Sequence, residues 1–284
     1  MTHPQTNGAR GTIITITSGK GGVGKTNVVI NLAVSLKRLG YKVGVLDADF
    51  GLGNIDVLLG MTPPYHIGHL LNGDKTLDEI TVEGPLGITI VPAGSGIQSL
   101  TRLDAKQWRE MTAVIRRIAA GLDFLLIDTA AGVSDNVIEL LRLAERVVVV
   151  TSYEPAAVVD AYAVIKILNT AAPGKELGLV VNATRDSEEA GLVFRQLDVA
   201  ATRFLSRSLH YYGFIVEDVE LREAVLGQRP IVEYMPQSPA SRCFRILASR
   251  LSGFAPRGGA GVRERRRQEG ATGSDGQEGS LRCA

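Results

Sequence analysis

The sequence has few cysteines and no long hydrophobic run. Its two cysteines, Cys243 and Cys283, lie far apart and near the C-terminus. This pattern argues against a disulfide framework and against a CxxC metal or redox site, and it fits a reducing cytosol. No stretch of about 18 apolar residues occurs, and residues 1–10 lack the apolar core of a secretory signal. We therefore expect a cytoplasmic protein without a membrane-spanning helix.

An excess of either charge is also missing. Lys and Arg together number 31, against 30 for Asp and Glu, so the net charge indicates no polyanionic partner. Hydrophobic residues make up 45% of the chain and charged residues 21%, which is typical of a soluble globular protein. The length of 284 residues allows one large α/β domain or two small ones.

Short runs rich in Ile and Val alternate with longer stretches of helical spacing. Runs that are apolar on both faces are typical of strands buried in a mostly parallel sheet, and the segments between them are typical of crossover helices. The predicted strands are residues 12–17, 42–47, 87–91, 123–128, 146–150, 177–182 and 209–215. The predicted helices are residues 25–39, 104–120, 134–144, 155–170, 188–206 and 239–252. The alternation predicts a single-domain α/β fold with a mostly parallel, doubly wound sheet and helices on both faces.

The alternation continues without a linker-like break until the composition changes near Phe254. The residues that follow are rich in Gly and Arg and contain almost no large aliphatic side chains. Such a segment cannot bury enough apolar surface to offset the entropy lost on ordering. We predict a disordered N-terminus at residues 1–11, a folded domain at 12–254 and a disordered tail at 255–284.

A phosphate-binding pattern follows the first predicted strand. The segment "GKGGVGKT", residues 19–26, fits G-x-x-x-x-G-K-[ST] and opens a predicted helix, which is the context that this pattern requires. Its glycines let the backbone N–H groups curl toward phosphate oxygens, and the start of the helix adds a positive dipole end. Lys25 should reach the β- and γ-phosphates, and the Thr26 hydroxyl should hold Mg²⁺. A chance glycine-rich turn is the alternative, and the combination of pattern and context disfavours it.

The loop contains a second lysine, Lys20, on its outer arm. Lys20 could be solvated and idle, or it could cross a dimer interface and contact the nucleotide bound by a second copy. The spacing alone does not choose between these alternatives. The residues that we expect to contact the nucleotide in and beside the loop are Gly19, Lys20, Gly21, Gly22, Val23, Gly24, Lys25, Thr26 and Asn27.

Three aspartates lie at the ends of predicted strands. Asp128 ends the apolar run in "LLIDTAAG", at the sheet edge where open α/β sheets bind ligands, and its carboxylate could hold Mg²⁺ through water. Asp47 and Asp49 end another strand in "DADFGLGN". Period-two spacing would put both side chains on one side if that strand continued to Asp49. For each aspartate the ordinary alternative is a solvated or capping carboxylate.

The segment "KGGVGKT" resembles the deviant phosphate-binding loop of the MinD/ParA-type ATPases. Other segments are similar to one branch of that family, the FlhG/FleN regulators of flagellar number and placement. They are "LDADFGLGNIDVLLG" (46–60), "LLIDTAAGVSDNV" (125–137) and "EPAAVVDAYAVIKILN" (154–169). The similarity extends from about residue 12 to 252, which is essentially the whole predicted folded part.

The resemblance implies an ATPase that needs Mg²⁺, turns over slowly and forms a homodimer with ATP. It assigns Lys20 to the nucleotide of the second copy, Asp49 to positioning the attacking water and Asp47 to the Mg²⁺ environment. Asn182, at the end of "LGLVVN", matches an adenine-contacting position, but Val216 replaces the proline of the family's "IPED" segment. The expected catalytic residues are Lys20, Lys25 and Asp49, and the expected metal residues are Thr26, Asp47 and Asp128.

The resemblance also implies partners. These are flagellar assembly proteins, namely an FlhF-like GTPase and components of the C-ring or switch, together with a flagellar transcriptional activator. The N-terminus shows no match to the "DQAxxLR" element with which some relatives activate their GTPase partner. No direct binding to nucleic acid is expected.

MinD-like proteins commonly end in an amphipathic helix that docks on the membrane. The last predicted helix is basic and has an apolar side, which superficially fits a membrane-surface helix. Closure of the domain core explains the same pattern, and we favour it. A peripheral location at the inner face of the membrane or the cell pole is thus suggested by the family more than by this sequence. The apolar side is formed by Cys243, Phe244, Leu247, Ala248, Leu251 and Phe254.

Other functions occur on the same fold. A ParA-type ATPase that partitions DNA or cargo, or positions cell division, is the main alternative; a DNA binder needs a basic face, which the near-neutral charge does not favour. An iron–sulfur carrier needs thiolate ligands near a dimer axis, and neither cysteine is placed for that role. A small-molecule kinase or ligase would transfer phosphate to a metabolite rather than to water.

Overall fold

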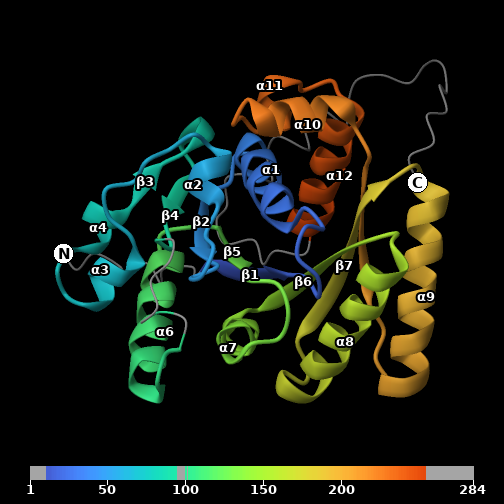
Figure 1. Ribbon diagram of the computed structural model, residues 1–284, viewed down its shortest axis with the longest axis horizontal. Coiled ribbons are helices and arrows are strands. Elements are labelled where there is room, and N and C mark those ends of the chain that lie inside the picture. Colours follow the sequence, from blue (N-terminus) through green and yellow to red (C-terminus); the bar gives the residue numbers. More distant parts are fainter. Residues whose placement is uncertain (1–10, 95–99, 101, 254–284) are drawn as a thin grey trace, which may run out of the picture.

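The computed structural model describes residues 11–94, 100 and 102–253, and one eight-stranded sheet lies at its centre (Figure 1). The strand order is β3-β4-β2-β5-β1-β6-β7-β8. Neighbouring strands are parallel except for the antiparallel edge pair of β3 and β4, which confirms the predicted fold class. The strands are β1 Thr12–Thr17, β2 Val43–Ala48, β3 Val82–Glu83, β4 Thr89–Val91, β5 Phe124–Thr129, β6 Arg146–Ser152, β7 Glu176–Thr184 and β8 His210–Val216.

Helices cover both faces of the sheet. Figure 1 shows α1, α10, α11 and α12 above it and α6, α7, α8 and α9 below it. Because both faces are covered, β1, β2, β5 and β6 are buried along their whole length, which explains their continuous apolar runs. The long helices are α1 Lys25–Arg38, α6 Ala105–Ala119, α7 Asp135–Leu143, α8 Pro155–Ala171, α9 Ser187–Leu205 and α12 Pro239–Gly253.

All seven predicted strands and six predicted helices are present, with boundaries that differ by a few residues at most. The short helices were not predicted from the sequence, because three to five residues carry too little periodicity to be recognised. The edge strand β3 and the two-turn helix α10 were not predicted either. The missed helices are α2 Ile55–Leu58, α3 Ile67–Leu71, α4 Leu77–Ile80, the 3₁₀ helix η1 Pro85–Gly87, α10 Val219–Leu226 and α11 Ile231–Tyr234.

Helix α12 closes the domain core. It packs against α1 and β8, and its apolar side is buried in these contacts. The apolar pattern of this helix is therefore used inside the domain, as we favoured from the sequence. None of the helices in the described residues has the length and apolarity needed to cross a bilayer. Phe254 and the predicted tail lie outside the described residues, as do residues 1–10.

Candidate nucleotide-binding site

The loop between β1 and α1 has the curled backbone that the sequence predicts. Gly22 and Gly24 have φ values of 80° and 85°, in the left-handed region that disfavours other residues. Two of the glycines are also required by close packing. A Cβ atom on Gly19 would lie 2.3 Å from the backbone carbonyl of Asp160, and one on Gly24 would lie 2.3 Å from the Asn182 amide nitrogen.

Lys25 begins α1 and points into the protein. Its Nζ atom lies 2.5 Å from Oδ1 of Asp128 at the end of β5, and both side chains are buried. Burial raises the pKa of Asp128, and the charge and hydrogen bond of Lys25 act in the opposite direction, with a further hydrogen bond from the Thr26 side chain. The predicted loop lysine and the predicted strand-end carboxylate are thus brought together, and their charges compensate one another in the interior.

Asp47 lies beside Asp128, because β2 and β5 are neighbours and these two residues are register partners. Its carboxylate accepts hydrogen bonds from the backbone N–H groups of Asp49 and Ile55, at 3.1 and 3.2 Å. Burial, followed by the charge of Asp128, raises the pKa of Asp47 to about 7. Two adjacent buried carboxylates with few counter-charges form a site that favours a bound cation.

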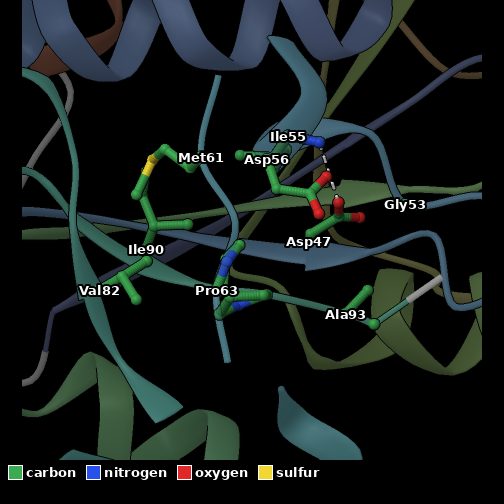
Figure 2. A pocket seen from close by; sticks show the side chains of 11 residues that line it. Asp47, Gly53, Ile55, Asp56, Met61, Pro63, Val82, Ile90 and Ala93 are labelled. Atoms are coloured by element: carbon green, nitrogen blue, oxygen red, sulfur yellow. Dashed lines mark hydrogen bonds between the residues drawn. The ribbon is translucent and has the colours of Figure 1, made fainter. Parts of the chain in front are cut away.

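Figure 2 shows the Ile55 N–H group directed at Asp47, beside a small pocket whose walls include Met61 and Ile90. The volume of this pocket is about 10 Å³, which leaves room for one water molecule at most. It is far too small for a nucleotide. Gly53 lies against the same carboxylate, since a Cβ atom there would be 2.9 Å from Oδ2 of Asp47.

Asp49 is positioned by a turn and not by the strand. Strand β2 ends at Ala48, so period-two spacing does not continue to Asp49. The Asp49 carboxylate instead accepts a hydrogen bond of 3.0 Å from the Leu52 N–H group. It remains close enough to Asp128 for its charge to contribute to the raised pKa of that residue.

The oxygen atoms of Thr26, Asp47 and Asp128 fit a hard cation such as Mg²⁺. The Thr26 side chain is hydrogen-bonded to Asp128, and Asp47 is adjacent to Asp128 across the strand pair. Within the described residues there is no group of three or more His, Cys, Asp or Glu side chains that could hold a metal ion. A cation here would therefore need further oxygens from phosphate and water, which is the usual coordination of Mg²⁺ in nucleotide sites.

A large cleft opens beside the loop, with a volume of about 680 Å³. The loop forms one part of its wall, and α10 with the end of β8 forms another. Asn182, two residues before the end of β7, lines the cleft and donates a hydrogen bond of 2.8 Å from its side-chain amide to the Val23 carbonyl. The cleft residues that argue for nucleotide binding are Gly21, Gly22, Val23, Gly24, Asn27, Asn182, Val216, Leu221 and Val225.

Lys20 lies on the surface at the rim of this cleft. Its Nζ atom is 2.8 Å from Oε2 of Glu154, and the two side chains are 42% and 54% exposed. The hydrogen bond and charge of Glu154 raise the pKa of Lys20. In a single copy, Lys20 is therefore paired with Glu154 at the rim of the cleft, outside the buried site that contains Lys25.

Comparison with known proteins identifies the family. The ParA family model, described as NUBPL iron-transfer P-loop NTPase, matches residues 10–252. The chain belongs to the ParA/MinD family of P-loop NTPases. The antiactivator FleN of Pseudomonas aeruginosa is 40% identical over 242 residues, which cover 85% of this chain and 86% of FleN.

Two further relatives agree with this assignment. The flagellum site-determining protein YlxH of Helicobacter pylori is 36% identical over 239 residues, covering 84% of this chain and 81% of YlxH. The solved structure of the septum site-determining protein MinD from Pyrococcus horikoshii, complexed with Mg-ADP, has a TM-score of 0.73 and 28% identity. The match covers 86% of this chain and 97% of the MinD chain.

The ParA/MinD fold brings residues to the cleft that the sequence analysis did not assign to it. Glu154 and Tyr153 follow β6, and Leu221 and Val225 come from α10. Glu154 lies in a segment that carried the family resemblance, and it directly precedes a proline that opens a helix. This position, between the end of a predicted strand and the start of a helix, was the sequence signal that could have assigned Glu154 to the site. The contact with Lys20 could not be predicted, because it joins residues that are distant in the sequence.

The family description mentions iron transfer, but the described part of this chain offers no thiolate cluster. Cys243 is the cysteine of that part, and it is buried in α12. An iron–sulfur site between two copies needs accessible thiolates. The geometry of the described residues therefore supports nucleotide binding and gives no support to an iron carrier.

Proposed function

We propose that this chain is an ATP-hydrolysing switch that forms a homodimer with ATP and regulates flagellar number or placement. The contrast between its two loop lysines is the observation on which this depends. Lys25 is buried in the site, whereas Lys20 is exposed at its rim and paired with an exposed glutamate. The flagellar role is inferred from the names of FleN and YlxH. We assign the switch to a domain at residues 12–254.

The proposed binding step uses charges that are already present. Lys25 exchanges Asp128 for the β- and γ-phosphates, and the loop N–H groups surround the phosphate oxygens. Asp128, Asp47 and the Thr26 hydroxyl would then hold Mg²⁺, which neutralises charge on the phosphates. Asn182 contributes to the base end of the cleft.

The proposed hydrolysis step takes place in the dimer. Asp49 orients the water that attacks the γ-phosphate, while Lys20 leaves Glu154 and contacts the nucleotide of the second copy. Hydrolysis and phosphate release remove these contacts, so the dimer dissociates and its partner surface changes. The free energy of dimer formation is in this way coupled to the bound nucleotide.

The proposed partners are proteins of the flagellar assembly machinery and a flagellar transcriptional activator. An FlhF-like GTPase and the C-ring or switch components belong to the first group. We propose a cytoplasmic location, with recruitment to the membrane or cell pole through these partners. Direct binding to nucleic acid forms no part of the proposal.

Light scattering with ADP and with a non-hydrolysable ATP analogue tests the switch. We expect wild type to be monomeric with ADP and dimeric with the analogue. Lys25→Ala should lose nucleotide binding, because the phosphate charges lose their buried counter-ion. Lys20→Ala should bind ATP but remain monomeric and fail to hydrolyse it. Near-normal ATP affinity in Lys25→Ala, or analogue-dependent dimers of Lys20→Ala, would refute these roles.

A deletion strain tests the biological output separately. We expect the number or position of flagella to change on deletion and to be restored by wild type but not by Lys20→Ala. Flagella that are unchanged in number and position would remove the flagellar part of the proposal and leave the nucleotide switch intact.

A further inference from the structure

Tyr153 is an exposed aromatic residue in the wall of the nucleotide cleft. It follows the last residue of β6 and precedes Glu154, the N-cap residue of α8. Its side chain lines the cleft and the residue is 48% exposed. Among the described residues it makes no hydrogen bond and no ring contact. The residue is thus placed in a concave site without a hydrogen-bond or ring partner from the described part of the chain.

The strand register places the backbone of Tyr153 at the sheet edge beside the loop. Ser152, at the end of β6, pairs with Asn182, two residues before the end of β7, and Tyr153 follows Ser152 at this sheet edge. Asn182 is bonded to the loop carbonyl of Val23. On its other side, Tyr153 adjoins Glu154, which holds Lys20 on the outer arm of the loop. Tyr153 and the α10 residues Leu221 and Val225 line this same cleft.

The two other parts of the cleft wall have distinct chemistry. The loop offers backbone N–H groups and suits phosphate, whereas α10 offers Leu221 and Val225 to an apolar ring, beside the ion pair of Arg222 and Glu217. A nucleotide with its phosphates on the loop must place its sugar and base toward α10 and past the β6–α8 turn. An aromatic ring presents a flat apolar face to such a group at little cost in conformational entropy.

We propose that the ring of Tyr153 packs against the nucleoside part of the nucleotide bound in its own subunit. The inference depends on the proposed function, because it needs ATP or ADP in the cleft. In this proposal Tyr153 contributes to the binding free energy through the nucleoside, whereas the loop binds the phosphates. The contact is made by the ring and does not require the hydroxyl group.

Isothermal titration of purified full-length protein with ADP and with a non-hydrolysable ATP analogue tests the contact. Tyr153→Ala should bind both nucleotides about fivefold or more weakly, which is the lower end of the effect of removing a stacked aromatic ring. Tyr153→Phe should bind both with wild-type affinity. In steady-state ATPase assays, Tyr153→Ala should raise KM and leave kcat unchanged, since the contact is the same in the ground and transition states.

A matched control comes from α9. Phe204 is also an exposed aromatic residue, 68% accessible, and it does not line the cleft, so Phe204→Ala should bind nucleotides normally. The urea midpoints of both alanine variants, measured without nucleotide, should equal that of wild type. A lower midpoint for Tyr153→Ala alone would mean that the ring supports the fold, and it would overturn the inference.

Three other results would overturn it. These are wild-type affinity in Tyr153→Ala, a Tyr153→Phe variant as weak as Tyr153→Ala, and a loss for the ATP analogue but not for ADP. The last result would place the ring between two subunits. Titrations of wild type and Lys25→Ala distinguish a failure of the proposed function from a failure of this inference alone. If wild type binds no nucleotide, the proposed function fails as well; if wild type binds and Tyr153→Ala binds equally, only this inference fails.

Discussion

At the scale of single residues, the site contains buried charges whose balance depends on neighbouring strands. The curled backbone at the loop glycines and the start of α1 at Lys25 agree with the sequence, because their geometry is set by a continuous local segment. The pairing of Asp47 with Asp128 was not predicted, since it requires β2 and β5 to be neighbours although β3, β4 and α6 lie between them in the chain. The same limit applies to Asp49, whose position is set by a turn that period-two spacing does not describe.

The raised pKa of Asp47 predicts a stability that depends on pH. In the folded state the pKa of Asp47 is about 7, against an ordinary value of 3.8. The folded state therefore binds the Asp47 proton more tightly than the unfolded chain does. The charged form is penalised in the folded state, and the penalty grows as pH rises from about 4 to 7 and is constant above that range. At about 1.4 kcal/mol per pH unit, it amounts to a few kcal/mol at most.

We therefore expect Asp47→Asn to be more stable than wild type at pH 8, with a smaller gain, or a loss, at pH 5. Asparagine keeps an acceptor for one of the two backbone N–H groups and removes the charge beside Asp128. Urea unfolding at both pH values, with EDTA and without nucleotide, measures the difference. An identical change with pH in wild type and variant would show that Asp47 is ionised without penalty.

At the scale of elements, the pattern of apolar residues predicted which segments form strands and helices. It did not always predict what the apolar side of a helix packs against. The strands were found because burial on both faces leaves continuous runs of Ile and Val. Helix α12 was ambiguous, since a membrane-surface helix and a core helix share one amphipathic pattern. The structure resolves this, because α1 and β8 occupy the apolar side of α12.

Adjacent residues of α12 give a prediction with a built-in control. Leu247 is 1% exposed and packs in the core, whereas Ile246 is 36% exposed on the outer side. Leu247→Ala should lower the free energy of unfolding by about 2–5 kcal/mol. Ile246→Ala should change it less, because about a third of Ile246 is already exposed to solvent in the folded state. Urea unfolding measures both. Equal small effects would mean that α12 is not packed as described.

At the scale of the whole molecule, the surface contact between Lys20 and Glu154 links the single copy to the proposed dimer. The two residues are 134 positions apart in the sequence, and the fold brings them together at the cleft rim. Sequence spacing left two roles for Lys20 open. The structure pairs Lys20 with Glu154. Any contact of Lys20 with a second copy must therefore compete with Glu154.

This competition predicts that Glu154→Gln forms dimers at lower protein concentration than wild type when a non-hydrolysable ATP analogue is present. The pair is exposed, so the gain should be severalfold at most. Sedimentation velocity over a concentration series measures it. Glu139→Gln, which removes another exposed ion pair from α7, should behave as wild type. Adding Lys20→Ala to Glu154→Gln should abolish the gain, because no lysine is then released. A dimer weakened by Glu154→Gln alone would show instead that this carboxylate stabilises the interface.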